Sequence, residues 1–178
     1  SDIGTDWQGG SEPYSVSGWM SGTGGVGYET GDRYDSLFDI DVIVMRNTYN
    51  SCYIRIPFNI SAGDSADFNF MTLRVRYDDG FVAYLNGVEI DRDYFSGTPQ
   101  WDSGASANHS DSKAENLIDF DVSDHIGLLQ DGANILAIHG LNEDDNQSDF
   151  LISVELVGGH SGAVVAEISP SAIEYTGP

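Results

Sequence analysis

The sequence has very little positive charge. Its 178 residues include seven Lys and Arg against 29 Asp and Glu, for a net charge of -22, and Lys113 is the single lysine. Nucleic acids and anionic membrane surfaces are polyanions and would be repelled by such a chain. We therefore expect no nucleic-acid partner and no membrane insertion. Cations and neutral polymers are the partners that this charge favours.

Cysteines and long apolar runs are also scarce. Cys52 is the single cysteine, so an intrachain disulfide is excluded. The first residues, SDIGTDWQGG, have neither the basic nor the apolar region of a signal peptide. No stretch approaches the ~18 apolar residues of a membrane-spanning helix. We expect an excised, soluble module.

Recognisable catalytic motifs are missing as well. The sequence contains no nucleophile elbow, P-loop, HExxH helix or Cys-His zinc pattern. Cys52 and His139 lie in apolar, strand-like surroundings, which indicates packing residues rather than a nucleophile and a base. A jelly-roll polysaccharide lyase is the enzymatic alternative, although lyases neutralise a uronate with basic residues that are scarce here. We expect no catalytic residues and a protein that is not an enzyme.

Alternation with a period of two dominates the chain. Ile54, Ile56 and Phe58 share one face of a predicted strand, and similar alternation occurs at 71–77 and 149–157. Residues 81–90 predict a hairpin around Asn86-Gly87, because this dipeptide tolerates the positive φ angles of a tight turn. Residues 134–139 are apolar on both faces, as in a central strand. The predicted fold is all-β, an antiparallel β-sandwich.

Three segments depart from this alternation. Residues 1–30 are rich in Gly and Ser with scattered aromatics, so we expect irregular structure pinned to the sandwich. Residues 122–129 could form a helical turn. Beyond a Gly-Gly pair, 159–178 resembles a linker or the start of a following module. The expected division is one β-sandwich module at 1–158 and this linker or new module at 159–178.

Two acidic loops are candidates for a metal site. Asp78-Asp79-Gly80 separates two predicted strands, and the loop 142–149 carries four carboxylates and three side-chain amides. Ca²⁺ is a hard ion that takes several oxygen ligands from loops. Ordinary turn geometry and a hydrated surface connection explain the same residues, so both interpretations stay open. The candidate Ca²⁺ ligands are Asp78, Asp79, Asp144, Asp145 and Asp149.

The loop after the predicted hairpin suits a sugar. Recognition of a pyranose needs an aromatic plane for its C–H face and polar side chains for its hydroxyls. Trp101 and Tyr94 could supply the plane, and hydrogen bonds could come from Arg92, Asp91 and Asn142. Alternatively, Trp101 only plugs the end of the sandwich.

Two longer phrases carry a family resemblance. YDDGFVAYLNGVEIDR, followed by Trp101 and by GANILAIHGLN at 132–142, is similar to the galactose-binding-like jelly roll that serves as a sugar-binding domain in glycoside hydrolases. The same run looks like a module of large, secreted, multidomain bacterial proteins. This resemblance covers roughly residues 19–157. It implies a non-catalytic, polysaccharide-binding role outside the cell, covalently linked neighbouring modules, and a structural Ca²⁺.

A second resemblance concerns Asp78 and Asp79. Adjacent aspartates before a glycine and a YxNG hairpin are similar to PA14-type sandwiches, in which the pair holds a Ca²⁺ that contacts sugar hydroxyls in some lectin-like members. The expected function is therefore a carbohydrate-binding module that attaches a secreted enzyme or adhesin to a polysaccharide, with bound Ca²⁺. The competing expectation is a calcium-stabilised structural or adhesive spacer without a glycan ligand.

Overall fold

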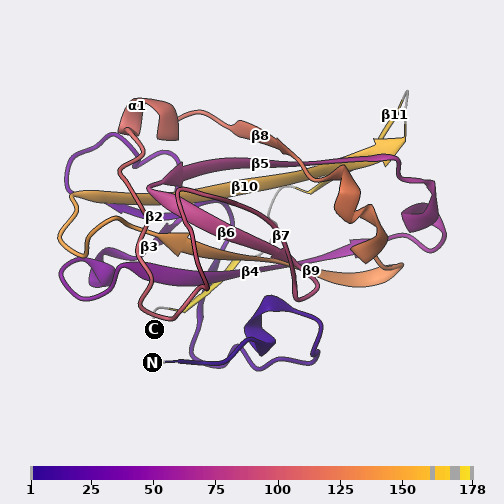
Figure 1. The fold of residues 1–178 in the computed structure, drawn as a ribbon, viewed down its shortest axis with the longest axis horizontal. Coiled ribbons are helices and arrows are strands. Elements are labelled where there is room, and N and C mark those ends of the chain that lie inside the picture. Colours follow the sequence, from indigo (N-terminus) through magenta and orange to yellow (C-terminus); the bar gives the residue numbers. More distant parts are fainter. Residues whose placement is uncertain (1, 161–162, 169–172, 177–178) are drawn as a thin grey trace.

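Two stacked sheets confirm the predicted β-sandwich (Figure 1). The computed structural model describes residues 2–160, 163–168 and 173–176. The lower sheet in Figure 1 has the order β1 (Met20–Gly22), β12 (Ile173–Thr176), β4 (Ser51–Ile60), β9 (Gly132–Leu141), β6 (Gly80–Leu85), β7 (Val88–Asp93). The upper sheet has the order β3 (Ile40–Asp41), β2 (Val26–Glu29), β10 (Asp149–His160), β5 (Phe70–Asp78), β8 (Ile118–Asp121), and β11 (Ala163–Ile168) pairs with β10. Strand neighbours are antiparallel, except for the parallel pair β2 and β3.

Helical structure is short and lies in the connections. It comprises α1 (Asp111–Ala114) and the 3-10 helices η1 (Asp6–Gln8), η2 (Ile43–Met45), η3 (Asp64–Asp67) and η4 (Ser123–Leu128). The last of these confirms the helical turn expected at 122–129. No helix in the part of the chain that the structure describes is long and apolar enough to cross a membrane.

Alternation places one face of each sheet in a shared core. On β5, Leu73 and Val75 are fully buried between the sheets, as the period of two predicts. Arg74 points away from that core and forms ion pairs with Asp119 at 3.0 Å and Glu155 at 2.6 Å. These pairs join β5 to its neighbours β8 and β10 across the outer face of the upper sheet.

The central strand β9 is apolar on both faces because both are covered. Leu136 and Ile138 pack into the core between the sheets, whereas Ile135 and Ala137 belong to a second apolar cluster on the outer face. Trp7 from the N-terminal segment lies in this second cluster. Figure 1 shows that segment beneath the lower sheet. The prediction of a central strand at 134–139 is confirmed.

The predicted hairpin is also confirmed. β6 and β7 pair around Asn86 and Gly87, whose φ angles are 51° and 87°. The Gly87 N–H donates a hydrogen bond to the Gln8 carbonyl at 2.9 Å, so the turn also holds the N-terminal segment.

Two predictions about organisation are corrected. Residues 1–30 are not wholly irregular, because β1 and β2 are strands and Tyr28 of β2 stacks on Phe150 in the core. The boundary expected after residue 158 falls inside β10, and β11 and β12 pair with strands of this same sandwich. Of the linker or following module expected at 159–178, residues 161–162, 169–172 and 177–178 lie outside the described residues.

Candidate functional site

Several strands begin or end at the same end of the sandwich. β5 ends at Asp78, β9 ends at Leu141 and β10 begins at Asp149. The connections that follow them meet there, because the Asp79 N–H donates to the Leu141 carbonyl at 2.9 Å and the Ala105 N–H donates to the Asn142 carbonyl at 2.8 Å. Both predicted acidic loops therefore lie at one end, together with the loop that carries Trp101.

Asp79 ties these loops together. Its carboxylate accepts hydrogen bonds from the backbone N–H of His109 at 2.9 Å and of Glu143 at 2.8 Å, and from the side-chain amide of Asn108 at 3.2 Å. The side chain is completely buried, and the peptide bond between Asp78 and Asp79 is cis. Three donors around one carboxylate compensate its burial. Asp79 therefore orders the loops around the site.

Asp78 belongs instead to a cluster of three carboxylates. One oxygen each from Asp78, Asp111 and Asp149 lie within 4.8 Å of one another. Asp78 and Asp149 are only 2% and 8% exposed, and the Tyr34 hydroxyl donates to Asp78 at 2.5 Å. The cluster could hold a metal ion, because a bound cation would offset the mutual repulsion of three carboxylates.

The pKa values in this cluster reflect burial without a positive partner. Burial raises the pKa of Asp78 well above its usual range, and the neighbouring Asp79 carboxylate raises it further. Burial also raises the pKa of Asp149 to about 6, with smaller contributions from the charges of Asp111, Glu29 and Asp79. Ionisation of either group is therefore costly without a cation beside it.

Asn142 has a further buried oxygen, on a side chain that is hydrogen-bonded to Asp149 of this cluster. Its amide N–H₂ donates to the Tyr28 hydroxyl at 2.9 Å and to the Asp149 backbone carbonyl at 3.2 Å. Its Oδ1 is buried and accepts no hydrogen bond from the residues that the structure describes. Carboxylate and amide oxygens are the ligands that hard cations prefer, so this donor set fits such an ion.

The predicted metal ligands separate into three groups. Asp78 and Asp149 lie together in the cluster, and Asp79 lies next to it. Asp144, which is exposed, and Asp145, which is half-buried, stay outside it in the acidic loop. Asp111 was missed. It sits in α1, some thirty residues from Asp79 in the sequence, and no local pattern marks Ser110-Asp111-Ser112 as part of this site.

Trp101 stands between two hollows at this end of the molecule. Its side chain is 37% exposed and lines one hollow of about 240 Å³ and a second of about 200 Å³. The loop is held in place, since the Ser51 hydroxyl donates to the Trp101 carbonyl at 2.9 Å and the Gln100 N–H donates to the Ser103 hydroxyl at 2.9 Å. The indole is thus a partly exposed plane on a fixed loop.

The larger of these two hollows has aromatic walls. Trp7, Tyr53 and Tyr84 line it behind Trp101, with ring centroids 4.3 Å apart for Trp7 and Tyr53 and 5.7 Å apart for Trp7 and Tyr84. Polar side chains surround it, and several are exposed or half-buried: Asp2, Thr5, Gln8, Thr98, Gln100. The smaller hollow adds Thr48, Tyr49, Asn50 and Asp102.

The other residues predicted for sugar contact do not gather around Trp101. Tyr94 is half-buried and packs on Tyr77 and His109. Arg92 is held by two 2.5 Å hydrogen bonds to Glu89 and donates to the Gly97 carbonyl, so it shapes the loop. Asp91 accepts the Arg92 N–H.

Asn142 requires a correction, because it is completely buried and bonded to Tyr28 and Asp149. It is not exposed for a sugar. The neighbours that bury it come from β2 and β10, which the spacing of the sequence could not place.

Cys52 and His139 are both buried, as the sequence indicates for packing residues. Burial raises the pKa of the Cys52 thiol far above its ordinary value and lowers the pKa of His139 to about 3. The thiol therefore stays protonated and the imidazole neutral at ordinary pH.

Comparisons with known proteins give only distant structural likenesses. No family model matches the chain, and no curated protein does. Solved structures similar to it include the Streptomyces avermitilis α-L-rhamnosidase complexed with L-rhamnose, at 18% identity and a TM-score of 0.49, covering 72% of this chain and 10% of that one. A lectin from Pleurotus ostreatus matches at 19% identity and a TM-score of 0.39, covering 69% of this chain and 28% of the lectin. The chain thus spans only a small part of each, and likenesses this distant carry no argument about its ligand.

Proposed function

We propose that this protein is a non-catalytic carbohydrate-binding module whose main contact surface is Trp101 and the two hollows beside it. The observation that carries the proposal is a partly exposed indole on a hydrogen-bonded loop, flanked by hollows with aromatic walls and polar rims. A sugar ring stacks its C–H face on such a plane while its hydroxyls meet the surrounding amides and hydroxyls.

The polar rim supplies hydrogen bonds of modest strength. Gln8, Gln100 and Asn50 place side-chain amides at the hollows, and each can donate and accept. A hydroxyl that leaves water for such a group gains about 1 kcal/mol net. Several sugar units must therefore bind together for useful affinity, which favours a polysaccharide over a monosaccharide.

Calcium is the cation that we propose for the Asp78, Asp111 and Asp149 cluster. The donor set is made of oxygens alone, which suits a hard ion. The loop that carries Trp101 continues to His109, whose N–H is bound by Asp79 next to the cluster. An ion there would stiffen this loop and so fix the position of the Trp101 ring. Alternatively, the ion contacts sugar hydroxyls directly, and the experiment below distinguishes these two roles.

The non-catalytic part of the proposal rests on the chemistry of the buried groups. The Cys52 thiol has a raised pKa and the His139 imidazole has a lowered one, which suits neither a nucleophile nor a base at neutral pH. A lyase is disfavoured further because it needs basic residues to neutralise a uronate, and the chain has only seven Lys and Arg. In the same proposal the module works outside the cell, where it holds an attached enzyme or adhesin near its polysaccharide.

Binding to a panel of plant, algal and animal polysaccharides, in Ca²⁺ and again in EDTA, tests the proposal. We expect at least one polysaccharide to retard the wild type in affinity electrophoresis. The affinity of Trp101→Ala for this polysaccharide should be at least tenfold lower. The control Val44→Ala removes an exposed apolar side chain that lines neither hollow and should bind like the wild type.

The EDTA arm separates the roles of the ion. Binding that is lost in EDTA while the melting temperature stays unchanged would place the ion in the sugar site, whereas both falling together would make it structural. If no polysaccharide binds in either buffer and only the melting temperature responds to Ca²⁺, the domain is a calcium-stabilised spacer and the proposed function is wrong.

A further inference from the structure

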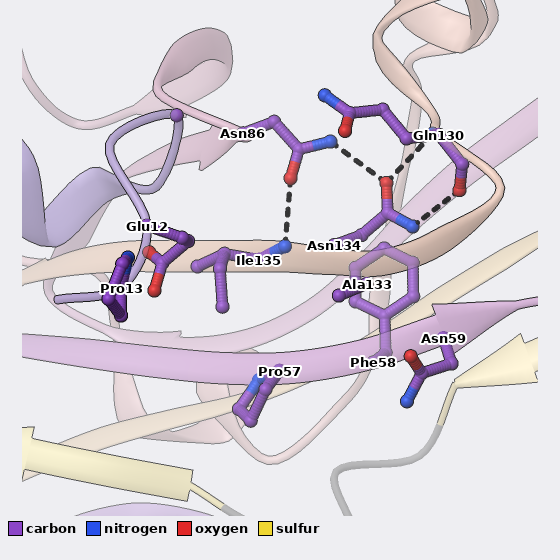
Figure 2. A pocket seen from close by; sticks show the side chains of 11 residues that line it. Glu12, Pro13, Pro57, Phe58, Asn59, Asn86, Gln130, Ala133, Asn134 and Ile135 are labelled. Atoms are coloured by element: carbon purple, nitrogen blue, oxygen red, sulfur yellow. Dashed lines mark hydrogen bonds between the residues drawn. The ribbon is translucent and has the colours of Figure 1, made fainter.

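A third hollow, of about 400 Å³, lies on the outer face of the lower sheet (Figure 2). We call it the Pro57 hollow. Its floor comes from the later part of β4 and the first part of β9, whereas the Trp101 hollow uses Tyr53 and His139 of the same two strands. Tyr53 and Pro57 are four residues apart on β4, which corresponds to about 13 Å along a strand. The two hollows are therefore separate places on one face.

The floor is flat and largely apolar. Pro57 pairs with Ile135, and Asn59 pairs with Ala133, across β4 and β9. Alternation puts these four side chains on the outer face, opposite to the core-facing Phe58. Three aliphatic side chains thus form a small apolar surface with the amide of Asn59 at its edge.

One wall is fixed by an amide network, drawn in Figure 2. The Asn134 Oδ1 accepts hydrogen bonds from the Asn86 side chain at 2.8 Å and from the Gln130 backbone N–H at 2.9 Å. The Asn86 Oδ1 accepts the Ile135 N–H at 2.8 Å. These two amides are therefore engaged within the protein, and they keep the wall in shape without a ligand.

The opposite wall is held by a buried arginine. Arg55 is only 2% exposed and donates to the Glu12 carboxylate at 2.6 Å and to the Trp7 carbonyl. Its guanidinium lies 4.9 Å from the centre of the Tyr14 ring. The charge of Glu12 is thus matched by a fixed cation, so this wall does not select for a charged ligand.

The rim carries hydrogen-bonding groups that the described part of the chain does not use. The side-chain amides of Asn59 and Gln130 are exposed and form no hydrogen bond with the described residues. A ligand that fits has an apolar face for Pro57, Ala133 and Ile135, hydroxyls for the two amides, and no net charge. These are the properties of a neutral sugar unit.

From this lining we infer that the Pro57 hollow is a second saccharide-binding site, independent of Trp101 and of any cation. It has the same class of ligand as the proposed function but shares no residue with the Trp101 hollows. A polysaccharide long enough to reach both places would bind more tightly than either hollow alone allows.

The test uses ¹⁵N-labelled Trp101→Ala protein in EDTA, which removes the platform and any bound ion. Neutral β-1,4-linked hexasaccharides of glucose, mannose and galactose are titrated separately while amide NMR spectra are recorded. At least one should shift the side-chain amide signals of Asn59 and Gln130 and the backbone signals of Ala133 and Ile135. The double variant Asn59→Ala, Gln130→Ala in the same background should bind at least tenfold more weakly. Asn146→Ala removes an exposed amide outside both sites and should bind normally.

The outcomes separate this inference from the proposed function. Shifts confined to other residues, or no shift with any of the three sugars, would overturn it whatever Trp101 does. Shifts at the Pro57 hollow, together with unchanged polysaccharide binding after Trp101→Ala in Ca²⁺, would support it and refute the Trp101 site. Normal binding by the double variant would also overturn it, since its two amides are exposed and their loss leaves the fold intact.

Discussion

At the scale of single residues, the adjacent aspartates Asp78 and Asp79 have different roles. The Asp79 carboxylate is surrounded by three N–H donors from two loops, whereas Asp78 meets two further carboxylates and a tyrosine hydroxyl. Asp78 is the last residue of β5, whereas Asp79 lies in the turn before β6, so the two side chains reach different surroundings. Asp79 thus holds the loops around the turn, and Asp78 supplies one carboxylate to the acidic cluster.

Asp79→Asn should strongly destabilise the fold. An asparagine has one oxygen and one NH₂, so in either orientation an N–H of His109 or Glu143 faces another donor. We expect a loss of about 2–4 kcal/mol in the free energy of unfolding, measured by urea denaturation. The exposed Asp144→Asn should change it by less than about 0.5 kcal/mol. Equal effects in the two variants would contradict the role assigned to Asp79.

The acidic cluster should make cation-free protein less stable as the pH rises. A carboxyl group with a raised folded-state pKa contributes stability below its unfolded pKa and loses that contribution as the pH passes its folded pKa. For Asp149 this window extends from the ordinary pKa near ~4 to about 6. Asp78 acts in the same direction over a higher range.

Urea denaturation in EDTA at pH 5 and pH 7 measures this effect. Relative to Asp149→Asn, the wild type should lose on the order of 1 kcal/mol between the two pH values. Added Ca²⁺ should stabilise the wild type more at pH 7, because a bound ion needs deprotonated ligands. A wild type that gains stability over the variant as the pH rises would show that the cluster is ionised without a cation.

At the scale of secondary-structure elements, the β6–β7 hairpin has a second role beyond pairing two strands. Its turn contacts the N-terminal segment, since Gly87 donates to Gln8 and a Cβ built on Gly87 would lie 2.5 Å from the Gly9 carbonyl oxygen. The segment in turn covers the outer face of β9 through Trp7. A hairpin predicted from the Asn-Gly dipeptide thus also holds the N-terminal segment, in which Gln8 lines the larger Trp101 hollow and Gly10 lines the Pro57 hollow.

Gly87→Ala should therefore lower the stability of the fold more than the same substitution at a glycine with a similar φ angle elsewhere. Gly87 and Gly63 have φ angles of 87° and 94°, but nothing lies within 4 Å of a Cβ built on Gly63. Both substitutions strain the backbone by about 1–2 kcal/mol, and only Gly87→Ala must also displace the N-terminal segment. We expect thermal unfolding to show a clearly lower melting temperature for Gly87→Ala than for Gly63→Ala. Equal melting temperatures would mean that the close contact contributes nothing.

At the scale of the whole molecule, the net charge of -22 opposes compaction. The carboxylates greatly outnumber their possible partners, and the ion pairs of Arg33 and Arg74 are partly exposed, so each contributes little. Dissolved salt screens repulsion between surface charges. In EDTA, raising NaCl from 0.05 to 0.5 M should therefore stabilise the fold by roughly 1 kcal/mol, or about 2–4 °C in melting temperature for a chain of this size.

Choline chloride provides the control for the salt series. If the effect is screening, both salts should raise the melting temperature equally. A rise with NaCl alone would indicate that Na⁺ occupies a specific site, and a fall with both would contradict net repulsion.

Much of the sandwich could be predicted because its signals are local. The alternation at 53–58 and 71–77, the Asn86-Gly87 turn and the apolar run at 134–139 each act through near neighbours or through burial of one face. The short strands β1, β2, β3 and β8 were missed, because two to four residues show too little periodicity. β11 and β12 lie in the segment expected to be a linker or the start of a following module. β12 pairs with β4, which is far away in the chain, whereas β11 pairs with the preceding strand β10.

The sequence by itself determined the class of fold, the shortage of positive charge and the presence of Trp101 in a polar loop, since these follow from composition and short-range pattern. Tertiary structure alone decided which carboxylates meet. It brought Asp111 to Asp78 and Asp149, left Asp144 and Asp145 outside, buried Asn142, and assembled the Pro57 hollow from four distant segments. The physical reason is that a binding site requires groups within a few ångströms, and only long-range strand pairing determines which loops come that close.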